Sequence, residues 1–180
     1  MNRWATVLIL SAVTAKAECV GIRLLNRQAA PVTAVLQAQR VAERIFGDVG
    51  VEVDWKARNA ACPVVEILFD QPAPLGSHGQ ALAYALPFAK ARTRVAVFFP
   101  RVAALSSAEN SGTNLGYVLA HEVGHVLEGQ TRHSSAGVMK AVWDRDDLHR
   151  MAREEMKFAT EDAEWIMAAL ASDSRRNAGQ

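Results

Sequence analysis

Two histidines that lie four residues apart, His121 and His125, constrain this chain more than any other feature. On an α-helix that spacing puts both imidazoles on one face, one turn apart. The flanking sequence has the periodicity of an amphipathic helix, with apolar residues at Leu115, Val118, Leu119, Val123, Val126 and Leu127. Polar cap residues over 111–114 precede this run, and Gly129 follows it, where a helix commonly ends in the left-handed conformation. The sequence therefore predicts a helix that presents two histidines side by side.

These two histidines have a direct chemical use. Imidazoles one helical turn apart can both bind one zinc ion, at Zn–N distances of roughly 2.0–2.1 Å. Glu122 lies about 100° around the helix from His121, so it can touch a metal-bound water without being a ligand. A hydrolytic zinc site needs two such ligands, a base and a third ligand from elsewhere. We therefore expect Zn²⁺ as the cofactor and Glu122 as the catalytic base.

His121 and His125 supply two ligands, so the third ligand has to come from another residue. Gly129 lets the chain reverse out of the helix, and residues 130–132 are long enough to bring His133 back towards the metal. Three carboxylates are the alternatives at this point: Glu128, Glu154 and Glu155.

The motif resembles that of the metzincin zinc proteases, in which a Gly, a third His and a Met follow the His-Glu-x-x-His sequence. The pair His133-Ser134 is similar to the matrixin branch, and the run from His133 to Met139 also resembles that of small exported bacterial proteins with the same motif. The resemblance implies that His121, His125 and His133 are metal ligands, that Glu122 is the base, and that Met139 is the Met-turn residue beneath the metal.

The spacing departs from the common metzincin pattern. In that pattern the Gly is the third residue and the third His the sixth residue after the second His. Here Gly129 is four residues and His133 eight residues beyond His125, so the loop is two residues longer.

The rest of the chain alternates between strand-like and helical patterns. Strands are predicted over 20–25, 51–55, 64–69, 80–86 and 94–99, and a helix from Pro31 to Gly47. Two further helices follow the motif: one capped by Asp144 or Asp146 that runs to about Glu155, and one capped by Thr160. Residues 172–180 lack apolar periodicity and are predicted to be a disordered tail.

This order of elements resembles the N-terminal half of a metzincin. The resemblance implies an α+β fold in one domain over 18–171, with a mixed, twisted sheet of about five strands, an active-site helix and C-terminal helices. It also implies that the strand from Gln80 to Leu86 is an antiparallel edge strand that pairs with an extended peptide or protein substrate. An open edge offers backbone donors and acceptors without demanding a particular sequence.

The N-terminus has the pattern of a secretory signal. A positive start ending at Arg3 precedes an apolar run over 4–15, too short to span a bilayer, and a small-x-small site ends at Ala17. We expect a signal peptide over 1–17, a mature chain that begins near Glu18, and a secreted or periplasmic location. After cleavage no membrane association is expected.

The two cysteines, Cys19 and Cys62, have an obvious use in an exported protein. Each directly precedes a strand-like run, over 20–25 and 64–69, and in a metzincin sheet the first and third strands are parallel neighbours. The resemblance therefore implies a Cys19–Cys62 disulfide.

The net charge of the chain limits the classes of partner that it is expected to bind. The formal net charge is +1, and the longest basic feature is Arg175-Arg176 near the C-terminus. These features argue against nucleic acid as a partner. A monomer is expected.

Together these patterns predict an exported zinc-dependent metalloendopeptidase that hydrolyses peptide bonds through a zinc-bound water activated by Glu122. Two alternatives stay open: a zinc-dependent amidase or hydrolase of another bond, such as one in cell-wall peptides, and an inactive, zinc-stabilised binding domain. The presence of Glu122 argues against the second, because a purely structural site needs no base and fills its fourth position.

Overall fold

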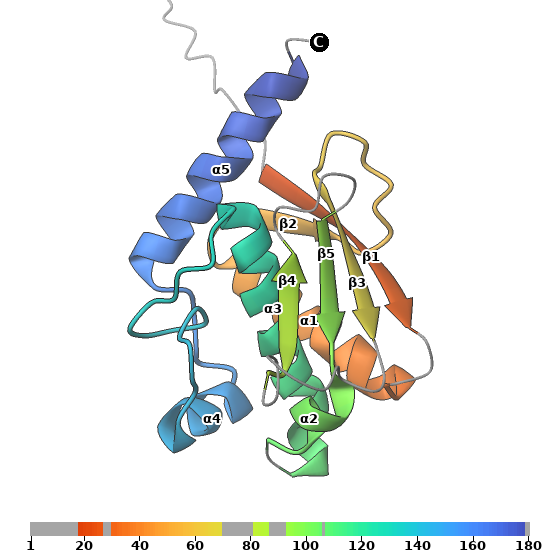
Figure 1. Cartoon of the computed structure of the whole chain (residues 1–180), viewed down its shortest axis with the longest axis vertical. Helices are drawn as coiled ribbons and strands as arrows, with labels where there is room; N and C mark the ends of the chain where they lie inside the picture. Colours follow the sequence, from red (N-terminus) through yellow and green to blue (C-terminus); the bar gives the residue numbers. More distant parts are fainter. Residues whose placement is uncertain (1–17, 27–29, 70–80, 87–92, 106, 179–180) are drawn as a thin grey trace, which may run out of the picture.

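A computed structural model describes residues 18–26, 30–69, 81–86, 93–105 and 107–178 of this chain. It has an α+β fold, as the sequence predicts, in which one five-stranded mixed sheet packs with helices (Figure 1). The predicted signal peptide over 1–17 lies outside the described residues.

The strand order in the sheet is β2-β1-β3-β5-β4. The strands are β1 (Glu18–Asn26), β2 (Val51–Asp54), β3 (Val64–Phe69), β4 (Ala83–Leu86) and β5 (Thr93–Val97). β1 pairs in parallel with both β2 and β3, and β3 pairs in parallel with β5. β4 pairs antiparallel with β5 at the end of the sheet. The antiparallel edge strand predicted over 80–86 is therefore confirmed over Ala83–Leu86, whereas Ala81 and Leu82 lie outside the strand.

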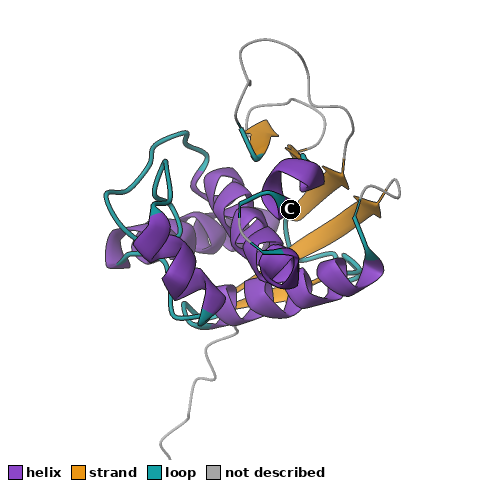
Figure 2. Cartoon of the chain, turned by 90° about the horizontal axis from the view of Figure 1, so that it is seen from below, coloured by secondary structure: helices purple, strands orange, loops and turns teal. Residues whose placement is uncertain are grey.

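Five α-helices and one 3₁₀ turn lie in the described part of the chain (Figure 2). They are α1 (Val32–Gly47), α2 (Phe99–Ala103), the 3₁₀ turn η1 (Ala108–Asn110), α3 (Ser111–Glu128), α4 (Arg145–Ala152) and α5 (Thr160–Ala178). None of the helices within the described ranges is long and apolar enough to cross a membrane.

Several predicted boundaries are wrong, and three of them have a local explanation. The strand expected over 94–99 ends at Val97, because Pro100 suits the first turn of α2 and offers no N–H for a sheet. The helix expected to reach about Glu155 ends at Ala152, ahead of Glu154 with its positive φ of 56°. α5 continues to Ala178, into the tail predicted to be disordered over 172–180. No Pro or Gly stands before Gly179 to stop that helix.

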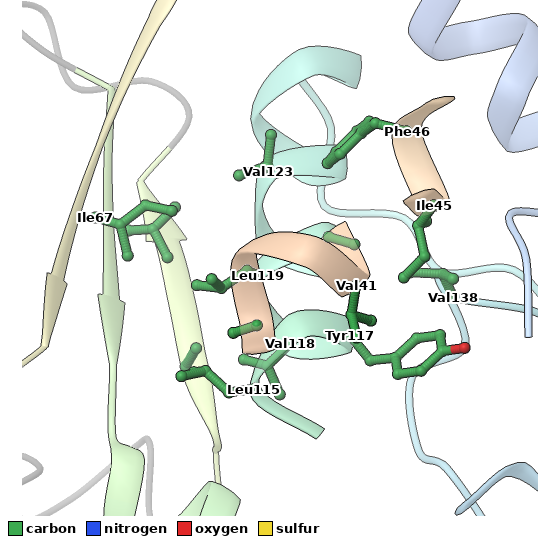
Figure 3. Close-up of a cluster of buried hydrophobic side chains, with 14 of the residues drawn as sticks. Val41, Ile45, Phe46, Ile67, Leu115, Tyr117, Val118, Leu119, Val123 and Val138 are labelled. Carbon is green, nitrogen blue, oxygen red and sulfur yellow. The ribbon is translucent and has the colours of Figure 1, made fainter. Parts of the chain in front are cut away.

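Helix α3 passes through the middle of the core. Its side chains meet those of α1, of the loop residue Val138 and of the sheet residue Ile67 in one cluster (Figure 3). Glycines set how closely α1 approaches. A Cβ added at Gly116 would lie 2.6 Å from Val41 Cβ, and one at Gly112 would lie 2.7 Å from Gln37 Cβ. Only glycine permits this packing at either position.

Cys19 of β1 is bonded to Cys62, just before β3, which confirms the predicted disulfide. The two half-cystines are 43 residues apart in sequence. In a chain-entropy model, closing a loop of that length stabilises the fold by about 4 kcal/mol. Such bonds persist in oxidising compartments.

The glycine contact between α1 and α3 yields a stability prediction. Gly116→Ala forces a methyl group into Val41 and should lower the free energy of unfolding by roughly 1–3 kcal/mol, the usual cost of overpacking. The matched control is Gly47→Ala at the end of α1, where an added Cβ meets nothing within 4 Å. That change should be neutral or stabilise by up to about 1 kcal/mol. Urea unfolding of both variants measures the difference, and equal stabilities would contradict the packing argument.

Candidate metal centre

Three histidines converge at the C-terminal end of α3. His121 and His125 project from one face of that helix and are buried, as their four-residue spacing predicts. α3 ends at Gly129, whose φ of 62° turns the chain back and returns His133 to the other two. The His133 side chain is exposed, so this ligand position faces solvent.

The three Nε2 atoms point at one another. His125 Nε2 lies 3.0 Å from His121 Nε2 and 3.3 Å from His133 Nε2. One ligand atom from each ring lies within 4.8 Å of the other two. In a tetrahedral zinc site, nitrogen ligands at Zn–N distances of 2.0–2.1 Å are about 3.3 Å apart. The two distances from His125 Nε2 are therefore close to those between ligands of one such ion.

Hydrogen bonds to backbone carbonyls set the tautomer of the two helical histidines. His121 Nδ1 lies 2.8 Å from the Val138 oxygen, and His125 Nδ1 lies 3.1 Å from the Gln130 oxygen. A carbonyl only accepts, so each Nδ1 carries the proton and each Nε2 presents a lone pair. Lone pairs that face one another at 3.0 Å are favourable only when a cation lies between them.

Burial keeps these imidazoles in the ligand form. It lowers the pKa of His121 to about 3 and that of His125 to about 4. Both rings are therefore neutral at neutral pH, as metal ligands must be.

Glu122 is buried beside the histidines and close to the edge of the sheet. Burial raises the pKa of its carboxyl to about 7, and a hydrogen bond with the backbone of Ala85 opposes that rise. Ala85 belongs to the edge strand β4. The carboxyl thus combines a pKa suited to proton transfer near neutrality with a position at the sheet edge.

Met139 packs against α3 at Gly124, next to His125 in the sequence. A Cβ added at Gly124 would lie only 2.7 Å from Met139 Sδ. The turn that carries Met139 is held by the Ser134 N–H, which donates to the Met139 carbonyl at 2.9 Å. At Gly137 φ is 76°, and an added Cβ would lie 2.6 Å from the Lys157 oxygen. Trp143 follows this turn and meets His121 edge to face, with ring centroids 5.6 Å apart.

The alternative carboxylates do not join the cluster. Glu128 faces Arg132 at 3.4 Å, Glu154 pairs with Arg44 at 3.2 Å, and Glu155 pairs with Arg153 at 2.9 Å. Within the described parts of the chain, the three histidines form the one group of His, Cys, Asp or Glu side chains with metal-ligand spacing.

One part of the site leaves no recognisable pattern in the sequence. Arg132 and Ser134, on either side of His133, both contact Asp162 of α5. Asp162 lies 28 residues beyond Ser134, and no spacing pattern links the two segments. The sequence offers only one weak indication, which is that Asp162 is an acidic residue in the first turn of α5. The helix dipole alone can explain an acidic residue at that place.

Comparison with protein-family models and with curated proteins finds no match for this chain. The chemistry assigned to the site therefore depends on its own geometry.

The buried carboxyl predicts a pH effect in the metal-free protein. Glu122 has a folded pKa near 7 against an ordinary value of 4.5. Its contribution to stability is therefore fully present below about pH 4.5 and is lost as the pH rises through 7. Glu122→Gln removes this titration, so the variant should gain stability relative to the parent, on the order of 2–3 kcal/mol, between pH 4.5 and 8.

Urea unfolding in the presence of a chelator measures this difference across the pH range. Glu164→Gln, at an exposed position of α5, is the control for the loss of a surface carboxylate. A stability difference between Glu122→Gln and the parent that does not change with pH would contradict the prediction.

Proposed function

We propose that this chain is an exported zinc metallopeptidase, a metalloendopeptidase of metzincin-like type. The observation that carries the proposal is the convergence of three imidazole Nε2 atoms, with His125 Nε2 at 3.0 and 3.3 Å from the other two. The run from His121 to Met139 resembles the metzincin motif, and Met139 packs beneath the helical ligands.

The residues present fit a zinc ion. His121, His125 and His133 would hold it, and three neutral imidazoles with an open fourth position are a common ligand set of catalytic zinc. The carbonyl partners of His121 and His125 are the outer hydrogen bonds that metal-bound imidazoles usually make. When bound at such a site, zinc polarises a carbonyl and lowers the pKa of a bound water to about 7.

The protein groups supply the proton transfers. Glu122 accepts a proton from the attacking water and then donates it to the leaving amine. In the metal-free chain burial raises the pKa of this carboxyl to about 7, which supports a role in proton transfer. A site with only a structural role has no use for a buried base of this kind, which favours an enzyme over a binding domain.

The edge strand β4 is the proposed binding place of the substrate. Among the described residues, β4 pairs with β5 on one side, and an extended peptide would add along its other edge. The hydrogen bond between Ala85 and Glu122 links this strand to the base. A peptide that adds to β4 is therefore held beside the groups that would cleave it.

The disulfide and the N-terminal sequence support export of the protein from the cytosol. The Cys19–Cys62 disulfide suits an oxidising compartment outside the cytosol, and the sequence of residues 1–17 is that of a cleavable signal. We place the mature protein in the periplasm or the external medium.

Metal content and hydrolysis of a peptide library test the function. His133→Ala should weaken zinc binding by more than about 100-fold, because it removes a ligand and even outer partners of ligands contribute 10–100-fold. Glu122→Gln should keep one zinc per chain but lose roughly 10²–10⁴-fold in hydrolysis, because it removes the base. Zinc is measured by competition with a chromogenic chelator, and cleavage by mass spectrometry.

The matched control is His149→Ala on α4, an exposed histidine away from the cluster. It should retain both zinc and activity. Absence of zinc from the parent protein, or full zinc affinity in His133→Ala, would overturn the proposed site. A parent that binds zinc and leaves every peptide intact would exclude the endopeptidase and leave a zinc hydrolase of another bond.

A further inference from the structure

The loop that carries His133 is attached to α5 through its two neighbours. Arg132 donates to Asp162 Oδ1 at 3.0 Å, and the Ser134 hydroxyl donates to the same oxygen. Arg132 also donates to Ser134 Oγ at 3.3 Å, so the three side chains form a closed triangle. The residues directly before and after His133 are thus tied to one carboxylate.

Arg132 is held on several sides. Its guanidinium lies 5.9 Å from the centre of the Trp165 ring and 3.7 Å from Glu161 Oε1, both on α5. Its Nε lies 3.4 Å from Glu128 Oε2 at the end of α3. Arg132 therefore connects the helix that carries two histidines to the helix that follows the site.

Burying this network of charged side chains costs desolvation free energy. The Asp162 and Glu128 side chains have no exposed surface, and Asp162 Oδ2 and both Glu128 oxygens have no hydrogen-bond partner in the described structure. Two buried carboxylates against one guanidinium stabilise a fold less than apolar side chains of similar size would. Stability alone does not account for the arrangement.

His133 differs from the other two histidines in what orients it. His121 and His125 are each fixed by a carbonyl at Nδ1 and by burial in α3. The described residues provide no comparable partner for His133 Nδ1, and its side chain is exposed. It also stands on the loop that follows Glu128, the last residue of α3, and not on the helix itself. Ordering such a loop around a metal costs conformational entropy unless other contacts already hold it.

We propose that Asp162 is a positioning residue for His133. By holding Ser134 and Arg132 it keeps the His133 ring at metal-binding distance before the metal arrives. This role extends the proposed function, on which it rests, to a residue of the C-terminal helix. Asp162 does for the third histidine what backbone carbonyls do for the first two.

Metal affinity of the full mature chain tests the proposal. Asp162→Asn should lower zinc affinity by about 10–100-fold, the range found for outer partners of metal ligands. Co²⁺ replaces zinc as a spectroscopic probe, and its visible absorption should change intensity in the variant because the ligand geometry changes. The matched control is Glu161→Gln, the exposed neighbour on the same helix that faces the same Arg132. It should bind zinc within about twofold of the parent, as exposed ion pairs contribute little.

A double-mutant cycle separates positioning from general stability. If Asp162 acts through His133, adding Asp162→Asn to His133→Ala should cause no further loss of zinc affinity. A second loss as large as the first would show that Asp162 acts on the fold as a whole and would overturn the proposal.

A second pair of variants covers a failure of Asp162→Asn to fold. Ser134→Ala should lower zinc affinity and alter the Co²⁺ spectrum, whereas Ser134→Thr, which keeps a hydroxyl, should restore both. Parental affinity and spectrum in Ser134→Ala would overturn positioning through Ser134. Failure of the parent itself to bind zinc is a different result, because it removes the proposed function rather than this inference.

Discussion

The close approach of α1 to α3 is the contact on which the rest of the structure depends. Gly112 and Gly116 lie one turn apart, and the absence of their Cβ atoms lets the α1 side chains Gln37 and Val41 reach the α3 backbone. Packing at this distance surrounds α3 with protein on nearly all sides. A helix buried in this way has little freedom to rotate or shift, so the groups it carries are held in place.

The same spacing of small residues continues into the site. Gly112, Gly116, Ala120 and Gly124 recur every fourth residue and therefore form one stripe along α3. Side chains of α1 pack against this stripe at Gly112 and Gly116, and Met139 packs against it at Gly124. Gly124 directly precedes His125, so the turn of Met139 and the helix that carries two of the histidines meet where side-chain volume is smallest. Positions on a rigid helix hold ligands more accurately than positions on loops.

The parts of the molecule that the sequence predicted are those with local patterns. The two helical histidines follow from a period of 3.6 residues. The edge strand, the parallel neighbours β1 and β3 and the disulfide were implied by the resemblance of the order of elements to that of metzincins. The triangle of Arg132, Ser134 and Asp162 joins segments 28 residues apart by side-chain contacts alone, which leave no periodic trace. Glu154 is similar. Its left-handed backbone ends the α4 region, and Arg44 and Gln37 of α1 both donate to its carboxylate at 3.2 Å. Gly or Asn is the usual residue in this conformation. At this position the contacts of Glu154 with α1 outweigh that preference.

The candidate site stores unfavourable interactions that the surrounding packing must offset. Two imidazole lone pairs face each other at 3.0 Å, and burial raises the pKa of Glu122 to about 7. Both features make the metal-free fold less stable than one with an apolar core at the same place. Any cation that binds the folded chain in preference to the unfolded one relieves the first of these costs and stabilises the fold in proportion to the logarithm of its concentration. The glycine contacts and the disulfide therefore have a consequence beyond stability: they let the fold assemble the three histidines in advance. A ligand set assembled in advance has little order left to acquire when the metal binds.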